Sequence, residues 1–173
     1  MITFACAACA RPLTRAVQLS ETLVRPEFDG QIGPDGYRRA PATMHAGLYA
    51  LEPEPWGAPF LPTDEPVTVF PGGPCVGDPD GHGFLTSAGP RNTIVLHPDD
   101  APDLLPNLEG DHTGCCGWHG QSGLNRLCPC GAAVGTEISE CYTAYELHLD
   151  PAQVHVLDSS IVGAPSEFGE AEQ

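Results

Sequence analysis

Two short cysteine pairs, Cys6-Ala7-Ala8-Cys9 near the start of the chain and Cys128-Pro129-Cys130-Gly131 near its end, decide the expected fold. Each pair lies in a turn of small residues next to a run that is typical of a strand. Such a turn presents two thiolates to one metal ion, and two turns together supply the four sulfur ligands of a tetrahedral zinc site. We therefore expect a structural Zn²⁺ ion, with the ligands Cys6, Cys9, Cys128 and Cys130.

The two pairs differ in regularity. The two-residue gap of the first also occurs in redox-active pairs, but those open a helix in a βαβ setting, whereas Arg11-Pro12-Leu13-Thr14 predicts the start of a strand. Buried free thiols are the other alternative for this pair. The second pair is one residue shorter than the usual Cys-Pro-x-Cys-Gly knuckle. Its Pro129 stiffens the turn, and Gly131 permits the left-handed backbone that a close approach to metal requires.

Short runs with alternating apolar residues predict a mainly β fold. Two such runs flank the first pair and make half of a zinc ribbon. After the second pair, Cys141, Tyr145, Leu147 and Leu149 fall on one face of an extended run. The expected strands are residues 2–5, 12–20, 44–51, 67–70, 93–97 and 135–149, with a further one around Val154 and Val156.

Helices are expected to be few and short. Pro98-Asp99-Asp100-Ala101 is typical of a capped helix start, and Pro102 and Pro106 limit how far it can run. Gly and Pro, 20 and 19 in number, gather between Pro26 and Pro90 and predict loops there. We expect one zinc-stapled domain over residues 1–166 with a loop-rich insertion at about 21–91, followed by a frayed acidic tail at 167–173.

The charge of the chain narrows its partners. Its 173 residues carry a formal net charge of −16, and the seven basic residues are all arginine. An acidic surface of this strength repels phosphate backbones, which disfavours nucleic acid as a partner. No apolar run approaches the roughly 20 residues of a membrane span, and the N-terminal residues lack the pattern of a signal peptide. We therefore expect a cytoplasmic location, which keeps the eight cysteines reduced; the alternative, an exported chain, would use them as disulfides.

A second cysteine-rich stretch lies between the two pairs. It runs Asp111-His112-Thr113-Gly114-Cys115-Cys116-Gly117-Trp118-His119-Gly120. One interpretation is a turn bounded by glycine in which the thiols are packed, because adjacent side chains diverge and rarely bind one zinc ion together. A second is an additional metal site that combines His112, Cys116, His119 and Cys141. The third is a reactive thiol, Cys115 or Cys116, with His119 as its base.

Two weaker signals are interpreted as structural. Cys75 has no partner nearby in the sequence and is expected to be a small buried apolar residue. The acidic segment Asp78-Pro79-Asp80-Gly81-His82 resembles part of a calcium loop, but without the full loop sequence it predicts only a turn.

The cysteine pattern of residues 92–156 resembles that of an uncharacterised group of bacterial proteins with a GCCG, Asn, C-x-x-C-G, Asp-Cys pattern. The matching residues are Gly114-Cys115-Cys116-Gly117, Asn125, Cys128-Pro129-Cys130-Gly131 and Glu140-Cys141. The chain departs from the pattern at Glu140, where Asp is usual, and in its shorter knuckle. The plan is also similar to that of the β-tent zinc proteins, which include the methionine-R-sulfoxide reductases and formaldehyde-activating enzymes. The resemblance implies zinc and β-tent-like knuckles that clamp small sheets, and it implies no reaction, because the catalytic motifs of those enzymes are missing.

The sequence favours a binding or regulatory role for a zinc-stapled protein, with a protein or small-molecule partner that it does not identify. The rival hypothesis is an enzyme that uses Cys115 or Cys116 with His119, or a metal ion with histidine ligands. A closed four-cysteine site favours the binding protein, and an open metal coordination position favours the enzyme.

Overall fold

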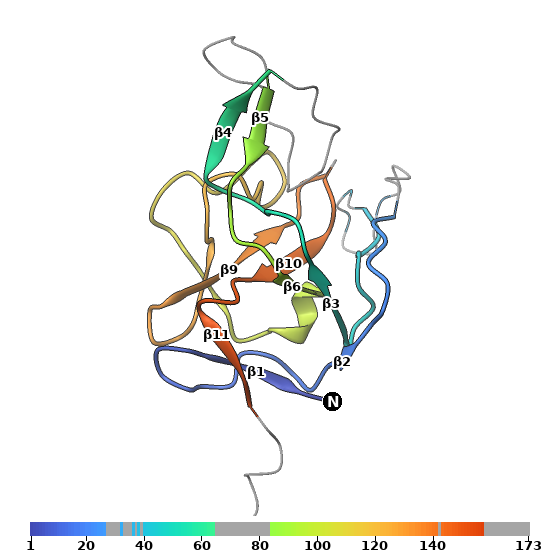
Figure 1. Cartoon of the computed structure of the whole chain (residues 1–173), viewed down its shortest axis with the longest axis vertical. Coiled ribbons are helices and arrows are strands. Elements are labelled where there is room, and N and C mark those ends of the chain that lie inside the picture. Colours follow the sequence, from blue (N-terminus) through green and yellow to red (C-terminus); the bar gives the residue numbers. More distant parts are fainter. Residues whose placement is uncertain are drawn as a thin grey trace, which may run out of the picture.

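The chain is mainly β in the computed structural model, which describes residues 1–26, 32, 36, 38, 40–64, 84–141 and 143–157. Within these ranges the regular elements are strands and one short 3₁₀ turn, η1 (Figure 1). Their bounds are β1 Thr3–Cys6, β2 Gln18–Leu19, β3 Leu48–Glu52, β4 Phe60–Thr63, β5 Phe84–Ser87, β6 Thr93–Leu96, η1 Pro98–Asp100, β7 Leu105–Pro106, β8 Arg126–Leu127, β9 Ala133–Ile138, β10 Glu146–Leu149 and β11 Val154–Leu157.

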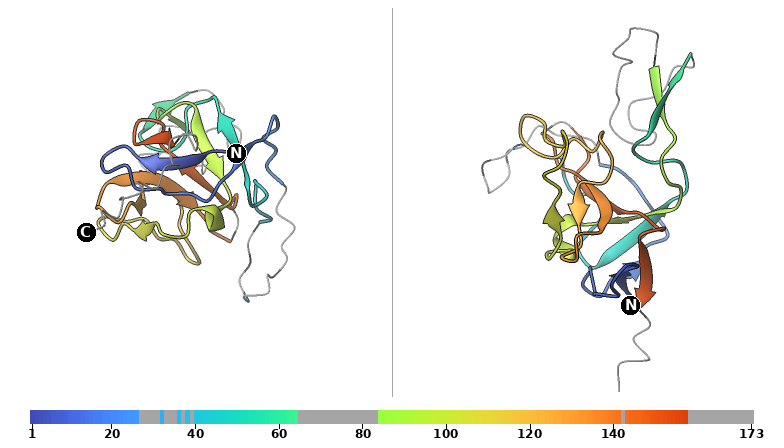
Figure 2. Two further views of the ribbon diagram at one scale, coloured as in Figure 1. Left: turned by 90° about the horizontal axis from the view of Figure 1, so that it is seen from below. Right: turned by 90° about the vertical axis from the view of Figure 1, so that its left-hand side faces the viewer.

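A seven-stranded sheet with the order β2-β3-β6-β10-β9-β8-β7 forms the body of the molecule. Its pairs are antiparallel apart from β2 with β3. Two small sheets accompany it. The β1–β11 pair lies beside the N-terminus at the lower end of Figure 1, and the β4–β5 hairpin extends from the opposite end. The right-hand view of Figure 2 shows the β4–β5 pair standing away from the main sheet.

The apolar core lies where the β1–β11 pair meets the main sheet. β6 and β10 are buried along their whole length, as expected for central strands covered on both faces. Phe4 and Val154 from the small pair pack in one cluster with Leu96, Leu147 and Leu149. Cys6 and Cys128 belong to the same cluster and are fully buried, so the two cysteine pairs begin at the edge of the core.

The expected mainly β fold is confirmed, and three of the expected strands form close to their predicted ranges. Strands form at β1, β6 and β11 within a residue or two of the expected ranges. The helix start at Pro98 is the one-turn η1, and the His97 side chain caps it by accepting a hydrogen bond from the N–H of Asp99. The isolated bridges Ala5–Pro12 and Ile2–Val17 close a hairpin around the first cysteine pair, which is the strand, turn and strand that the sequence predicts there.

Three expected strands need correction. The run 135–149 is a hairpin, because a turn after Ile138 brings β10 back against β9. The run 12–20 forms a regular strand only at Gln18–Leu19. The Thr14 hydroxyl accepts from the N–H of Phe4 and the Asp100 carbonyl accepts from the N–H of Arg15, so these two N–H groups do not pair as they would between regular strands. The run 44–51 is shifted to Leu48–Glu52, because Gly47, at φ +84°, turns the chain just before it.

Part of the expected insertion belongs to the main sheet. β3 lies between β2 and β6 in the strand order, so the stretch 21–91 is not a loop added to a finished domain. The expected strand at 67–70, the turn at 78–82, Cys75 and the acidic tail lie outside the described residues. No helix of the described part is long and apolar enough to cross a membrane.

A buried polar cluster stabilises the middle of the sheet. Arg25 pairs with Glu52 at 2.9 Å and with the fully buried Glu146 at 3.1 Å. His148 donates from Nε2 to Glu146 at 3.0 Å and accepts from the Thr93 hydroxyl at 2.7 Å. The Trp56 ring stacks on the His148 ring, with the centroids 3.9 Å apart. Burial lowers the pKa of His148, so this histidine is neutral and Arg25 is the cation that balances the buried carboxylates.

Candidate metal centres

The first candidate centre brings together the two cysteine pairs of the sequence analysis. Cys6 ends β1 and Cys128 follows β8, and the chain segments 6–10 and 128–131 turn back after them. In each turn a backbone N–H returns to the first cysteine, from Ala10 to the Cys6 carbonyl and from Gly131 to the Cys128 carbonyl, both at 2.8 Å. The four predicted ligands Cys6, Cys9, Cys128 and Cys130 have their sulfur atoms within 4.8 Å of one another.

The sulfur distances match a single tetrahedral ion. Zinc–sulfur bonds of about 2.3 Å at tetrahedral angles require sulfur atoms about 3.8 Å apart. Across the two turns, the Sγ of Cys6 lies 3.8 Å from that of Cys130, and the Sγ of Cys9 lies 3.6 Å from that of Cys128. These separations are far longer than a disulfide bond of about 2.05 Å. The geometry is that of a mononuclear four-sulfur site.

The backbone of the two turns shows why the second pair carries a glycine. Gly131 has φ +93°, and a Cβ there would meet no atom within 4 Å, so the glycine serves the left-handed backbone and not a close contact. Ala10 occupies the corresponding position of the first turn and also has a positive φ, of 58°. An alanine in this region costs of order 1 kcal/mol or more. The first turn therefore stores strain that the second avoids.

Electrostatics differ among the four thiols. Burial raises the pKa of Cys128 to about 12. At the exposed Cys130, the backbone N–H of Ala132 donates to the sulfur and, with the neighbouring Cys128 and Cys9 thiols, lowers its pKa to about 7. An N–H that points at a sulfur favours the thiolate, which is the form that binds metal.

A second candidate centre forms around the stretch Gly114-Cys115-Cys116-Gly117. This stretch is the tip of a tight hairpin closed by the Thr113–Trp118 bridge and by a 2.8 Å hydrogen bond from the Gly114 N–H to the Gly117 carbonyl. The hairpin docks on the end of β9, where Trp118 donates its N–H to the Ser139 hydroxyl and accepts from the Ser139 N–H. Cys115, Cys116, Glu140 and Cys141 then have ligand atoms within 4.8 Å of one another.

The two glycines of the hairpin provide room for this docking. A Cβ on Gly114 would lie 1.6 Å from Oε1 of Glu140, and a Cβ on Gly117 would lie 2.3 Å from the Ser139 carbonyl oxygen. Neither glycine has a left-handed backbone, so close packing is the reason for both. The GCCG sequence thus places two thiols over a carboxylate.

Glu140 is nearly fully buried, at 1 % exposure, and its side chain is held by thiols. Its Oε2 lies 3.3 Å from the Cys115 sulfur and 3.5 Å from the Cys116 sulfur. Burial acts to raise the pKa of Glu140, but hydrogen bonds from both thiols and from backbone N–H groups outweigh it, and the pKa is lowered. The other buried glutamates of the described part, Glu52, Glu137 and Glu146, each pair with an arginine.

All three cysteines of this second centre are at least partly exposed. The sulfur of Cys115 lies 3.2 Å from that of Cys116 and 3.7 Å from that of Cys141. Cys115 is exposed, and Cys116 and Cys141 are half-buried. Hydrogen bonding to the Cys116 thiol, to Glu140 and to the Cys141 thiol raises the pKa of Cys115 to about 12.

These positions correct two interpretations of the GCCG stretch. The glycine-bounded turn is present, but the thiols are not packed away, and the adjacent sulfurs converge instead of diverging because the hairpin tip is clamped on Glu140. The histidines do not join them in the described part of the chain. His112 donates to the Glu109 carbonyl, and His119 accepts from the Gln121 N–H. Glu140 is the residue that sequence reasoning missed, although its place beside Cys141 was a usable signal.

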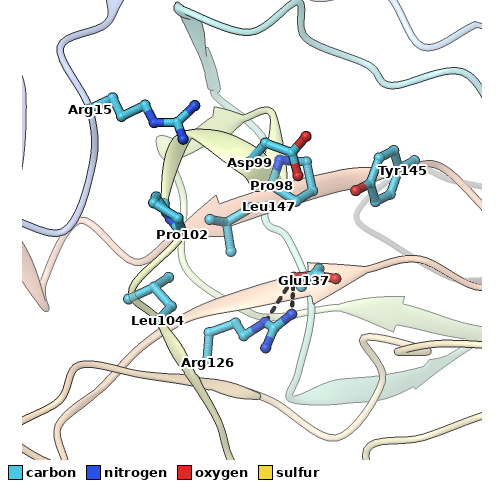
Figure 3. A pocket seen from close by; sticks show the side chains of 10 residues that line it. Arg15, Pro98, Asp99, Pro102, Leu104, Arg126, Glu137, Tyr145 and Leu147 are labelled. Atoms are coloured by element: carbon cyan, nitrogen blue, oxygen red, sulfur yellow. Dashed lines mark hydrogen bonds and ion pairs between the residues drawn. The ribbon is translucent and has the colours of Figure 1, made fainter.

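A separate cavity of about 420 Å³ lies between η1 and strands β8 to β10. Figure 3 shows Arg15 and Arg126 on opposite sides of it, with Leu104, Pro102 and Leu147 between them and Glu137 bound to Arg126. Its volume is in the range of small-molecule pockets. It shares no residue with either cysteine cluster.

Comparison of the chain with protein-family models, with curated proteins and with solved structures gives no match. The assignment of the two centres therefore depends on their geometry.

Proposed function

We propose that the chain is a zinc-binding protein of the cytoplasm in which Cys6, Cys9, Cys128 and Cys130 hold one structural Zn²⁺ ion, and that its role is binding or regulation. The observation that carries the proposal is the pair of sulfur–sulfur distances, 3.8 and 3.6 Å, across the two turns. They fit the four-sulfur geometry in which zinc leaves no position for a substrate.

The position of the centre supports a structural role. It connects residues more than a hundred positions apart, and a clip that closes so long a loop removes much chain entropy from the unfolded state. Two of its cysteines lie in the core cluster with residues of β1 and β11. Zinc there would fasten the β1–β11 pair to the main sheet.

The binding role has a candidate location in the cavity between η1 and β8. Arg15 and Arg126 flank it, and Arg126 is already neutralised by Glu137. Arg15 is exposed and its guanidinium makes no ion pair with the described residues. Asp99 also lines the cavity, so the arrangement favours a small polar molecule whose anionic group pairs with Arg15 and whose donor groups can face Asp99.

The alternative of a thiol enzyme based on Cys115 or Cys116 has no geometric support. No hydrogen bond joins His119 to either sulfur in the described residues, where its Nδ1 already accepts from Gln121 at 2.9 Å.

Metal analysis of the purified protein tests the proposal. The protein prepared without chelator should contain zinc, with X-ray absorption showing sulfur at about 2.3 Å. The double variant Cys6→Ser/Cys128→Ser should lose one ion per chain, and Cys115→Ser/Cys141→Ser, which also removes two thiols, should keep it. As a test that does not depend on the folding of the first variant, wild type is also stripped with chelator and reloaded. A stripped protein that keeps its full hydrogen-exchange protection contradicts the proposal, as does iron in place of zinc, which accepts the same tetrahedral sulfur set.

A further inference from the structure

The second cluster, Cys115, Cys116, Cys141 and Glu140, has no role in the structural zinc site. Its ligand atoms lie within 4.8 Å of one another and it shares no residue with the first cluster. Together the two clusters account for seven of the eight cysteines of the chain. A function for these three thiols has to explain why they gather on a carboxylate.

Glu140 is the observation that points to a cation. A carboxylate at 1 % exposure is costly to bury unless a positive charge or several strong donors compensate it. Glu52, Glu137 and Glu146 solve this problem with arginine. Among the described residues, the side chain of Glu140 contacts thiols and backbone N–H groups and no arginine, so the partner that would balance it is a positive charge that thiols also favour.

The distances describe a set of three sulfurs and one oxygen. Zinc–sulfur bonds of about 2.3 Å and zinc–oxygen bonds of about 2.1 Å place tetrahedral sulfur and oxygen ligands about 3.6 Å apart. The observed separations from Oε2 of Glu140 are 3.3 and 3.5 Å, and the Cys115–Cys141 separation is 3.7 Å against about 3.8 Å for two sulfurs. The adjacent pair, at 3.2 Å, narrows one angle of the tetrahedron.

We infer that Cys115, Cys116, Cys141 and Glu140 form a second zinc centre, which takes up and releases its ion at the surface while the structural ion stays bound. The carboxylate closes the site from the protein side and the exposed Cys115 opens it toward solvent. A carboxylate is a harder ligand than a thiolate and holds zinc less firmly. The ion at this centre is therefore exchangeable, and it is open to an incoming thiol or imidazole ligand.

The hairpin is built so that loss of this ion does not unfold the domain. Its tip is held by backbone hydrogen bonds, by the Thr113–Trp118 bridge and by the Trp118–Ser139 contacts, none of which involves a ligand atom of the cluster. The core cluster of β1, β6, β10 and β11 contains none of the four residues. Metal content at the second centre can thus vary in a folded protein.

Stepwise metal titration of the whole protein tests this inference. Wild type loaded with zinc should contain two ions per chain and lose them to a competing chelator in two stages. When Co²⁺ replaces zinc, the sulfur-to-cobalt charge-transfer absorbance lost in the first stage and that lost in the second should have a ratio of about 3 to 4. The reason is that each absorbance follows the number of thiolates bound, three in the second cluster and four in the first. Far-UV circular dichroism should stay constant through the first stage.

Two variants assign the stages. Glu140→Gln should weaken the first stage at least about 100-fold, since loss of a direct ligand exceeds the 10- to 100-fold effect of outer contacts. Cys141→Ser should abolish that stage, and neither variant should alter the second. Glu109→Gln, an exposed acid next to the hairpin, is the matched control and should behave as wild type.

Three results would overturn the inference. One is a single zinc ion per chain in protein that was purified under reducing conditions, together with a disulfide between Cys115 and Cys116. Another is an unchanged first stage in Glu140→Gln. The third is a loss of both stages together, which would make the clusters one cooperative unit. Failure of the structural site is a different result, because it would remove the second stage and leave the first.

Discussion

Both cysteine clusters present sulfur atoms, but the backbone that positions these atoms is built differently in each. Their glycines show this difference most clearly. In the four-cysteine cluster, Gly131 has a left-handed backbone and open space around it. In the second cluster, Gly114 and Gly117 have no side chain because Glu140 and Ser139 occupy that space. The first cluster is a pair of turns at the edge of the core whose sulfur atoms could hold one ion. The second is a surface hairpin clamped onto a buried carboxylate.

Depth separates them further. In the first cluster Cys6 and Cys128 are fully buried among apolar residues while Cys9 and Cys130 are exposed, whereas each cysteine of the second cluster is at least partly exposed. A ligand set that includes two core residues couples metal binding to folding, because those residues take part in both. Where the ligands lie on a hairpin that backbone hydrogen bonds already hold, the hairpin can fold without the metal. The number of sulfur ligands alone therefore does not decide whether a bound metal would be structural; the position of the ligands relative to the core decides it.

The largest expected effect separates the clusters by stability. Structural zinc contributes an apparent 10–16 kcal/mol or so, comparable with the roughly 5–15 kcal/mol that holds a domain. Cys128→Ser should therefore destroy cooperative unfolding or lower the melting temperature by tens of degrees. Cys115→Ser, at an exposed position, should shift it by only a few degrees. Calorimetry of the two zinc-loaded variants measures this, and equal shifts would erase the distinction between the clusters.

Hydrogen exchange locates the same effect. Removal of all metal should expose the amides of β1 and β11 and of the turns at 6–10 and 128–131, while β4 and β5 change little. Protection that falls evenly over the whole chain would show that the four-cysteine centre does not hold the β1–β11 pair in particular.

An intermediate effect tests the two uses of glycine. In Gly114→Ala the new Cβ would fall 1.6 Å from the Glu140 carboxylate, so the carboxylate must leave and the second ion should be lost while the first remains. In Gly131→Ala the cost is backbone strain alone, about 1–3 kcal/mol, and both ions should remain. Metal analysis counts the ions per chain in each variant, and urea unfolding measures the loss in the free energy of unfolding. Retention of two ions in Gly114→Ala would contradict the role assigned to Glu140.

The convergence of Cys6, Cys9, Cys128 and Cys130 could be predicted from sequence because they come in two local pairs with a spacing typical of metal ligands. The second centre could not, since its ligands are individually ordinary and only the packing of a hairpin on the end of β9 assembles them. Glu140 in particular has no local pattern beyond its neighbour Cys141. The strands were predictable where β-branched residues run together, as at β6. The run 135–149 was not, because its periodicity continues across a turn that only long-range pairing reveals.

The smallest expected effect concerns acid sensitivity. Acid releases thiolate-bound zinc from both clusters, because the ligands must be deprotonated, and the buried cluster around His148 adds a contribution without metal. Burial lowers the pKa of His148 below its ordinary 6.5, so the unfolded chain binds a proton that the folded chain does not. The free energy of unfolding should therefore fall as pH drops through 6.5. The lowered pKa of Glu146, about 2, adds to this only below pH 4.5.

Substitution at His148 isolates this contribution from the metal. Zinc-saturated His148→Gln can keep hydrogen bonds to Glu146 and Thr93 but has no charge to gain, so its stability should fall less between about pH 7 and about pH 5.5, by about 1 kcal/mol. The exposed His155→Gln is the matched control and should follow wild type. Denaturant unfolding at the two pH values measures the difference. If His148→Gln loses as much stability as wild type, the acid sensitivity comes from the two metal centres alone. The change in the free energy of unfolding with pH can then be measured in Cys115→Ser, which separates the contribution of the second centre from that of the first.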